Sequence, residues 1–291
     1  MRVGMIGLGF MGSGMAANLL KGGIDLTVND ILPEKVERAV SLGARAAGSV
    51  GALVERVDVV LASLPSVEVC RQVFLGPGGV IEHARAGQVL VDHSTVDLVA
   101  SRECAEAAAA KGAGFLDAPV SGGPKGAEEG TLSIMVGGER AAFETARPVF
   151  DLMGTNVRHM GGSGSGTAMK LMNQLLVSVH TCAAAEAFLL AERAGLDVQT
   201  AADVLHVSWG GSTILERNAP IVKRREFAGS GAPVRLFVKD LGILTKLGRD
   251  LGIALPMSNL AQELINETSE TFGDDYDVSA PFLVLEKRSG G

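Results

Sequence analysis

The chain has 291 residues, of which 47% are hydrophobic and 20% charged, and its formal net charge is -7. This length allows two domains of ordinary size with a substantial core. The only basic run is KRR at 223–225, so the basic stripe of a nucleic-acid-binding protein is missing and we expect no nucleic-acid partner. Three widely spaced cysteines without a CxxC pair argue against a zinc site or a disulfide framework and fit a reducing cytoplasm.

The first predicted element is a short apolar strand over 2–6, followed by GLGFMG at 7–12 and then a helix. Gly7, Gly9 and Gly12 therefore form G-x-G-x-x-G between a strand and a helix. The first glycine allows the tight turn, the second lets the backbone approach a pyrophosphate, and the third lets the helix pack on the strand. This arrangement predicts a dinucleotide-binding loop, and we include Met11, inside the motif, among the cofactor-binding residues.

A second predicted strand, DLTVND, ends at Asp30, eighteen residues after Gly12. An acid at this place can accept hydrogen bonds from a ribose 2′-hydroxyl and would repel a 2′-phosphate. We therefore expect NAD as the cofactor, in preference to NADP. The alternative is an unrelated glycine-rich turn with a surface aspartate.

Strands and helices continue to alternate, which predicts an α/β fold with a doubly wound parallel sheet. Further strands are expected in VDVVLASLP (57–65), GQVLVDHST (87–95) and GAGFLDAPV (112–120), with a helix at 97–110. Loops at the carboxyl ends of such strands line the cofactor crevice. We therefore expect Leu64, Pro65 and Thr95 beside the cofactor, although Thr95 could equally cap the following helix.

The second half of the chain has the periodicity of helices only. A glycine cluster at 161–166 marks the expected boundary between a Rossmann domain, 1–162, and an all-helical domain, 163–291, joined by one long helix that ends at Gly195. The apolar stretch 171–191 in that helix also contains Asn173, Gln174, His180 and Glu186, and it is too polar for an unassisted membrane span. We expect no membrane partner.

Four ordered motifs carry a family resemblance that runs from residue 1 to about 285. They are IGLGFMGSGMAANLLKGG, DAPVSGGPKGAEEGTLSIMVGG, GSGTAMKLMNQ and FVKDLGI. The chain resembles the β-hydroxyacid dehydrogenase family, which includes 3-hydroxyisobutyrate dehydrogenase and tartronate semialdehyde reductase. The resemblance implies a Rossmann domain with a helical second domain, NAD(P)-dependent oxidation of a CH–OH group in a small hydroxy acid, and a homodimer or homotetramer.

Lys170 stands in the otherwise uncharged segment GSGTAMKLMNQLL. Oxidation of an alcohol needs a base for the hydroxyl proton, and the ordinary lysine pKa of about 10.4 is too high for this role near neutrality. Burial in an apolar helix face favours the neutral amine. Asn173 lies at i+3, on the same face, where it can hold the substrate. The alternative is a lysine that snorkels from a buried helix.

Ser121, Gly122 and Gly123 offer a hydroxyl and consecutive backbone N–H groups, which suit an anion. The resemblance implies that they bind the substrate carboxylate, and that Lys239, in FVKDLGI, closes the site and contacts substrate or cofactor. The alternatives are a plain glycine turn and an ordinary surface pair of Lys239 with Asp240.

The substrate is left open among several small acids. The second half is similar to the L-threonate dehydrogenase branch, which makes L-threonate or a related sugar acid the first candidate. Tartronate semialdehyde and 3-hydroxyisobutyrate are alternatives, and a non-catalytic dinucleotide-binding interaction module is an alternative of another class. The five histidines have no metal-ligand spacing, so we expect no metal.

Overall fold

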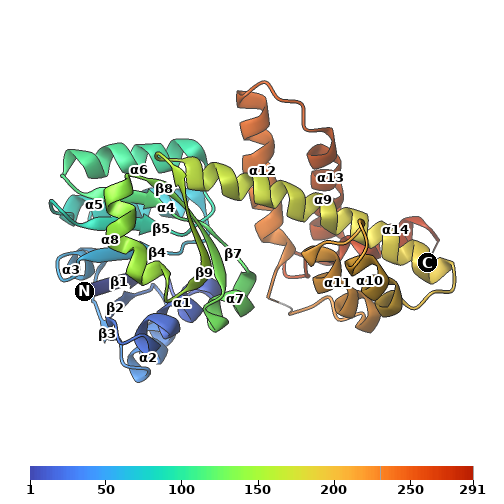
Figure 1. Ribbon diagram of the computed structural model, residues 1–291, viewed down its shortest axis with the longest axis horizontal. Coiled ribbons are helices and arrows are strands. Elements are labelled where there is room, and N and C mark those ends of the chain that lie inside the picture. Colours follow the sequence, from blue (N-terminus) through green and yellow to red (C-terminus); the bar gives the residue numbers. More distant parts are fainter. Residues whose placement is uncertain (230, 291) are drawn as a thin grey trace. The chain divides into compact units, whose positions relative to one another are not determined.

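The computed structural model describes residues 1–229 and 231–290. Contacts within the chain divide it into two compact units, residues 1–170 and the residues from Leu171 onward. The first unit contains the sheet and the second contains helices only (Figure 1). The predicted fold, a Rossmann domain and an all-α domain with one long helix, α9 (Ser165–Arg193), is confirmed. The expected boundary after residue 162 falls in the loop that precedes α9.

The first unit alternates strands and helices. Its strands are β1 (Arg2–Ile6), β2 (Asp25–Asn29), β3 (Arg45–Ala46), β4 (Val59–Ala62), β5 (Val89–Asp92), β6 (Gly114–Asp117), β7 (Val120–Ser121), β8 (Leu132–Gly138) and β9 (Gly154–Gly161). Its helices before α9 are α1 (Phe10–Lys21), α2 (Pro33–Ser41), α3 (Val50–Val54), α4 (Val67–Leu75), α5 (Val80–His83), α6 (Leu98–Ala110), α7 (Gly123–Glu129) and α8 (Arg140–Phe150).

The strands form one sheet in the order β3-β2-β1-β4-β5-β6-β8-β7, with β9 paired to β8. The neighbours from β3 to β6 are parallel, as predicted, whereas β8 runs antiparallel to both β6 and β7. The prediction of a parallel sheet is therefore incomplete beyond β6. The reason is the short connection between β7 and β8. It contains α7 and Gly130, which follows the helix with a left-handed backbone (φ +70°). A short reversal returns the chain antiparallel, while parallel pairing needs a longer crossover.

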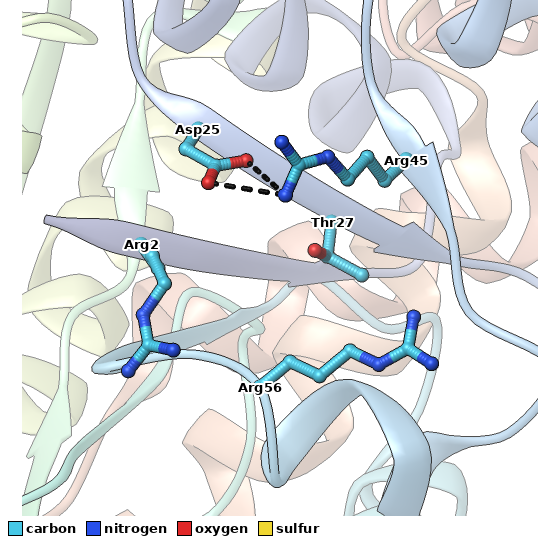
Figure 2. Close-up of a pocket in the computed structure, with 5 residues that line it drawn as sticks. All are labelled: Arg2, Asp25, Thr27, Arg45 and Arg56. Carbon is cyan, nitrogen blue, oxygen red and sulfur yellow. Dashed lines mark hydrogen bonds and ion pairs between the residues drawn. The ribbon is translucent and has the colours of Figure 1, made fainter.

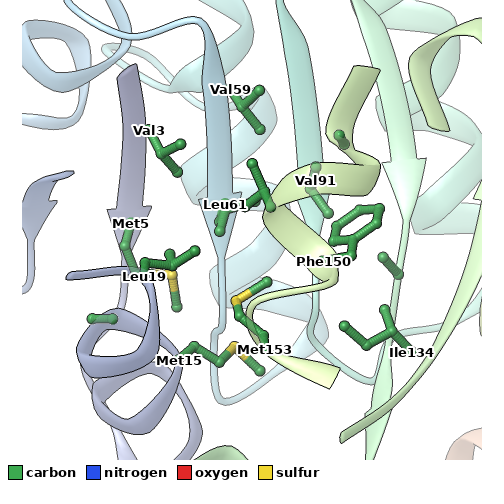
Figure 3. Packing of buried hydrophobic residues seen from close by; sticks show 14 of the residues in the cluster. Val3, Met5, Met15, Leu19, Val59, Leu61, Val91, Ile134, Phe150 and Met153 are labelled. Atoms are coloured by element: carbon green, nitrogen blue, oxygen red, sulfur yellow. The ribbon is translucent and has the colours of Figure 1, made fainter. Parts of the chain in front are cut away.

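Alternating side chains on the strands build two cores, one on each face of the sheet. On one face, Val3, Met5, Val59 and Leu61 pack with residues of α1 and α8, and Figure 3 shows this packing around Phe150. The other face carries the intervening strand residues, packed against α3, α4, α5 and α6. Successive residues of a strand point to opposite faces, so continuous apolar strands such as VVLA are buried on both sides.

The second unit has a helical core of its own. Its further helices are α10 (Val198–His206), α11 (Thr213–Arg224), α12 (Val234–Asp250), α13 (Pro256–Phe272) and α14 (Pro281–Arg288). Phe188 of α9 and Phe282 of α14 are fully buried in a cluster with residues of α10 and α11. Asp197 and Ser212 cap α10 and α11 by accepting backbone N–H groups, which satisfies donors that a helix start leaves unpaired.

The helix α9 is long and apolar enough to cross a membrane by length and composition alone, with a mean hydropathy of 1.5. In the 18-residue segment of α9 to which this hydropathy refers, 44% of the residues are buried inside the protein. The core helix of a soluble protein passes the same test, so this finding is weak evidence for a span.

Candidate functional site

The carboxyl ends of β1, β2, β4, β5 and β6 lie at one edge of the sheet, because these strands run parallel. β1 and β4 are neighbours, and the order in which strands are added reverses between them: β2 and β3 lie on the side of β1, and β5 and β6 lie on the side of β4. In doubly wound sheets, ligands bind in the crevice at this point. The predicted cofactor loops therefore follow adjacent strands at one edge.

The glycine loop after β1 has the geometry of a pyrophosphate cradle. Gly7 has φ +86°, and a Cβ on Gly12 would lie 2.0 Å from the carbonyl oxygen of Gly7, so α1 begins in direct contact with the turn. A Cβ on Gly9 would meet nothing within 4 Å, which leaves open space beside the backbone. α1 starts at Phe10 without a side-chain cap, and its first N–H groups are available to an anion. These residues fit a dinucleotide.

Asp30 follows β2 and is fixed against the glycine loop. Its Oδ2 accepts the N–H of Leu8 (2.6 Å), and its Oδ1 accepts the N–H of Leu32 (2.9 Å). Each carboxylate oxygen keeps a second lone pair, so Asp30 can still accept bonds from a ribose. Met11 is half-buried in the first turn of α1 and packs against the core.

The loops after β4 and β5 are tied to each other. Ser94 accepts the N–H of Leu64 through its hydroxyl (2.8 Å), while Pro65 is exposed and Thr95 is half-buried. The alternative role of Thr95 as a helix cap is wrong, because Asp97 caps α6 by accepting the N–H of Ala100 (2.7 Å). Aspartate ranks above threonine as an N-cap residue, which agrees with this choice.

Ser121 ends β7, and Gly122 and Gly123 lead into α7 with φ +131° and +63°. Both glycines are exposed, and α7 has no side-chain cap, so no capping side chain occupies the N–H groups at the start of this helix. Asn18 of α1 holds α7 in place. Its amide donates to the carbonyl oxygen of Ala127 (2.6 Å).

Lys170 lies in the first two turns of α9 and is buried, with 8% of its surface exposed. The start of α9 is attached to the sheet by Asp117, the last residue of β6. Its carboxylate accepts the N–H groups of Gly164 (2.8 Å) and Thr167 (2.7 Å). Burial raises the pKa of Asp117, and these N–H groups act in the opposite direction. The predicted burial of Lys170 is thus present in the structure.

Two predicted site residues of the second unit, Asn173 and Lys239, are joined by a polar chain. Asn173 donates to Gln174 (3.0 Å), and Gln174 donates to Oδ2 of Asp240 (2.6 Å). Oδ1 of Asp240 lies 2.9 Å from the ammonium of Lys239. Gln174 and Asp240 are both buried, at 5% exposed. The pair therefore joins the half-buried Lys239 to a buried carboxylate, and it is not an ordinary surface pair.

Comparisons with known proteins decide the family. A family model described as "NAD binding domain of 6-phosphogluconate dehydrogenase" matches residues 2–162, and one described as "NAD-binding of NADP-dependent 3-hydroxyisobutyrate dehydrogenase" matches residues 164–285. The chain belongs to the β-hydroxyacid dehydrogenase family. It is therefore an NAD(P)-dependent oxidoreductase of the class that acts on hydroxyl groups.

Individual members of the family match over nearly the whole chain. The 2-(hydroxymethyl)glutarate dehydrogenase of Eubacterium barkeri is 37% identical over 99% of this chain and 96% of its own length. The 2-hydroxy-3-oxopropionate reductase of Escherichia coli is 36% identical over 98% and 97%. The crystal structure of 3-hydroxyisobutyrate dehydrogenase from Salmonella typhimurium has a TM-score of 0.88, at 32% identity over 97% of this chain and 99% of that one.

A cavity of about 300 Å³ lies away from the family's cofactor edge, near the amino ends of β1 and β2. Figure 2 shows its lining, in which Arg45 pairs with Asp25 (3.2 Å); Arg2 pairs with Asp58 (2.8 Å).

Within residues 1–229 and 231–290, no three His, Cys, Asp or Glu side chains gather to hold a metal ion. The absence of a metal from the reaction stays a prediction.

Sequence reasoning missed several residues that contact the candidate site residues or the elements that carry them. It did not assign Asp117, Asn18, Gln174 or Asp240 to the site. The contacts that would have indicated a role reach far along the chain: from Asp117 to Gly164, from Asn18 to Ala127, and from Gln174 to Asp240. A buried acid at the end of a predicted strand, as in FLDAP, was the one available signal for Asp117.

His93, which directly follows β5, predicts a pH dependence of stability. It is buried at 3% exposed, and its Nδ1 donates to the carbonyl oxygen of Ala118 (2.7 Å). Burial lowers its pKa from 6.5 to about 4. Between these pH values the unfolded chain binds more protons, so the free energy of unfolding falls as pH drops from 6.5 towards 4, by about 3 kcal/mol.

The test compares the wild type with His93→Asn, whose amide can still donate to Ala118. Urea unfolding at pH 7 and at pH 4.5 should show a smaller loss for the variant. Burial also raises the pKa values of Asp92 and Asp117, which stabilises the fold on acidification, so the difference between the two proteins is the relevant quantity. Equal losses in both would contradict the role of His93.

Proposed function

We propose that the protein is a dehydrogenase of a small hydroxy acid, with L-threonate or a related sugar acid as substrate and NAD as the preferred cofactor. The observation that carries the proposal is the buried Lys170, fixed by α9 at the same sheet edge as the glycine loop after β1. When bound, NAD supplies a nicotinamide ring that accepts a hydride and returns it in the reverse direction.

Lys170 is proposed as the group that moves the proton. As the hydride leaves the carbon of the alcohol, the Lys170 amine takes the proton of the hydroxyl, and in the reverse direction the ammonium returns it. Its burial supports the role because a water-excluded site strengthens the interactions that orient the alcohol. Asn173, one turn along α9, is proposed to hold the substrate hydroxyl or carboxylate.

The carboxylate of the substrate is proposed to bind at Ser121, Gly122 and Gly123. Their backbone N–H groups and the serine hydroxyl are hydrogen-bond donors, α7 has no side-chain cap that would occupy its first N–H groups, and donors to a carboxylate form charge-assisted bonds. We further propose that Lys239 contacts substrate or cofactor, with its ammonium held by the buried Asp240.

The cofactor preference is proposed from Asp30. Its carboxylate is held by the N–H groups of Leu8 and Leu32, and a fixed negative charge favours a ribose diol over a 2′-phosphate. Gly7, Gly9, Gly12 and Met11 are proposed to line the pyrophosphate side, and Leu64, Pro65 and Thr95 the remaining cofactor contacts.

A panel of small hydroxy acids, followed by NADH absorbance, tests the function. We expect NAD-dependent oxidation of L-threonate or another four-carbon sugar acid, with little activity on 3-hydroxyisobutyrate. Reduction of tartronate semialdehyde with NADH as the best reaction would replace the proposed substrate. Bound NAD without turnover of any acid in either direction would favour a non-catalytic dinucleotide-binding module.

We also propose a cytoplasmic homodimer or homotetramer. Burial raises the pKa values of Cys104 and Cys182 to about 12, so both thiols stay protonated and unreactive. Light scattering at several protein concentrations measures the assembly.

A further inference from the structure

Asp117 lies at the junction of the sheet with the helix that carries Lys170. It is the last residue of β6 and is 1% exposed. We propose that Asp117 is a positioning residue, which fixes the first turn of α9 and thereby the place at which Lys170 presents its amine. The inference rests on the proposed function, in which Lys170 moves the proton.

Both carboxylate oxygens of Asp117 are used by the start of α9. Oδ1 accepts the N–H of Gly164 and Oδ2 accepts the N–H of Thr167. The N–H groups of a first turn have no partner inside the helix, and a negative charge at this end interacts favourably with the helix dipole. A residue 47 to 50 positions earlier in the chain thus acts as the helix cap.

The backbone around this carboxylate has no spare room. A Cβ on Gly166 would lie 2.3 Å from the carbonyl oxygens of both Asp117 and Met135, and a Cβ on Gly137 would lie 2.5 Å from Oδ1 of Asp117. Asp117 and Gly137 are also paired in register between β6 and β8. The first turn of α9 therefore packs directly against β6 and β8, and this close packing fixes its position.

Lys170 follows Thr167 by three residues, which is about 4.5 Å along a helix. A further bond fixes the same turn, because the hydroxyls of Ser101 in α6 and Thr167 are 2.9 Å apart. Less than one turn of helix therefore separates Lys170 from Thr167, which Asp117 and Ser101 hold in place. Since a displacement of about 1 Å at a reacting group can cost about 10²-fold in rate, a loosened anchor should lower the rate of the chemical step.

The test uses Asp117→Asn and Asp117→Ala, with Asp92→Asn as the matched control. Asp92 is a buried carboxylate at the end of β5, in register with Asp117, and it accepts the N–H of Ser94 and not that of α9. We expect kcat to fall about tenfold for Asp117→Asn and further for Asp117→Ala. KM for NAD should change less than about threefold, and Asp92→Asn should keep kcat within about threefold while it loses stability.

Hydrogen–deuterium exchange of the full-length protein gives a readout that does not depend on turnover. Exchange in residues 164–170 should be faster in Asp117→Asn and unchanged in Asp92→Asn. Unchanged exchange and unchanged kcat in Asp117→Asn would overturn the inference. Equal losses of kcat in both variants would also overturn it, since the role would then be structural only. If exchange is faster in Asp117→Asn but the wild type turns over no hydroxy acid, Asp117 still fixes the first turn of α9, and the proposed function is wrong.

Should the Asp117 variants fail to fold, Ser101→Ala tests the same turn more gently. It removes the hydroxyl partner of Thr167 and leaves the carboxylate in place. We expect faster exchange in residues 164–170 and a kcat reduced about twofold to fivefold, with KM for NAD retained. Unchanged values of both would count against a first turn that positions Lys170.

Discussion

Replacing Lys170 by methionine is expected to lower kcat by about 10² to 10⁴-fold, the range that general acid–base catalysis contributes. Methionine keeps the length and the helix propensity of the side chain and suits its buried position, but it cannot exchange a proton. Binding of NAD should survive, because the cradle of Gly7, Gly9 and Gly12 lies in the loop between β1 and α1 and in the first turn of α1, away from α9 in the chain. Single-turnover hydride transfer and a separate titration with NAD measure the two effects.

Two further variants sharpen this experiment. Lys170→Arg keeps the positive charge but stays protonated at all accessible pH values, so it should be nearly as slow as Lys170→Met. A fast Lys170→Arg would indicate that the charge alone matters. Lys246→Met is the matched control, since Lys246 is an exposed residue of α12 that pairs with Asp250. Turnover of Lys170→Met within tenfold of the wild type would refute the proposed role.

Replacing Asp30 by serine is expected to shift the ratio of kcat/KM for NAD over NADP by about 10² towards NADP. Two effects add. The ribose loses a charged acceptor, worth about 1.5–3 kcal/mol, and the 2′-phosphate loses a repulsive charge, which is worth about 1 kcal/mol in water and more near a protein surface. The measurement is kcat/KM for both cofactors at fixed ionic strength, since salt screens exposed charges.

The control for this experiment is Asp25→Ser, on the same strand. Asp25 begins β2, at the end remote from Asp30, and forms an exposed ion pair with Arg45. The change of net charge is the same, so the cofactor ratio should move only if overall charge matters. A wild-type enzyme that already prefers NADP would overturn the interpretation of Asp30.

Local patterns in the sequence predicted much of the first unit. The period of the strands, the glycines between β1 and α1 and the length of α9 are all local signals, and each has a physical cause within a few residues. The direction of β8 could not be predicted in this way. It depends on the left-handed turn at Gly130 and on the pairing of β8 with both β6 and β7.

Long-range polar contacts were the second feature beyond reach of the sequence. The sequence assigned a role to Asn173 and none to its neighbour Gln174, whereas the structure shows Gln174 bonded to Asp240, 66 residues away. A sequence gives the chemistry of an amide and a carboxylate, but the fold decides which of them meet. The cap of α6 was missed for a different reason, since Thr95 and Asp97 are both good capping residues.

The amide of Asn18 has a consequence for how enzymes of this kind can diversify. It ties the helix behind the nucleotide loop to α7, and Gly14 is packed against Ala127 so closely that a Cβ would lie 2.8 Å from its backbone. Because of these contacts, α1 and α7 are expected to move together. With the acid bound at the glycine turn before α7 and the coenzyme at the loop before α1, as proposed, a displaced turn would also disturb coenzyme binding. We therefore expect new substrates to arise by exchange of side chains around an unmoved turn.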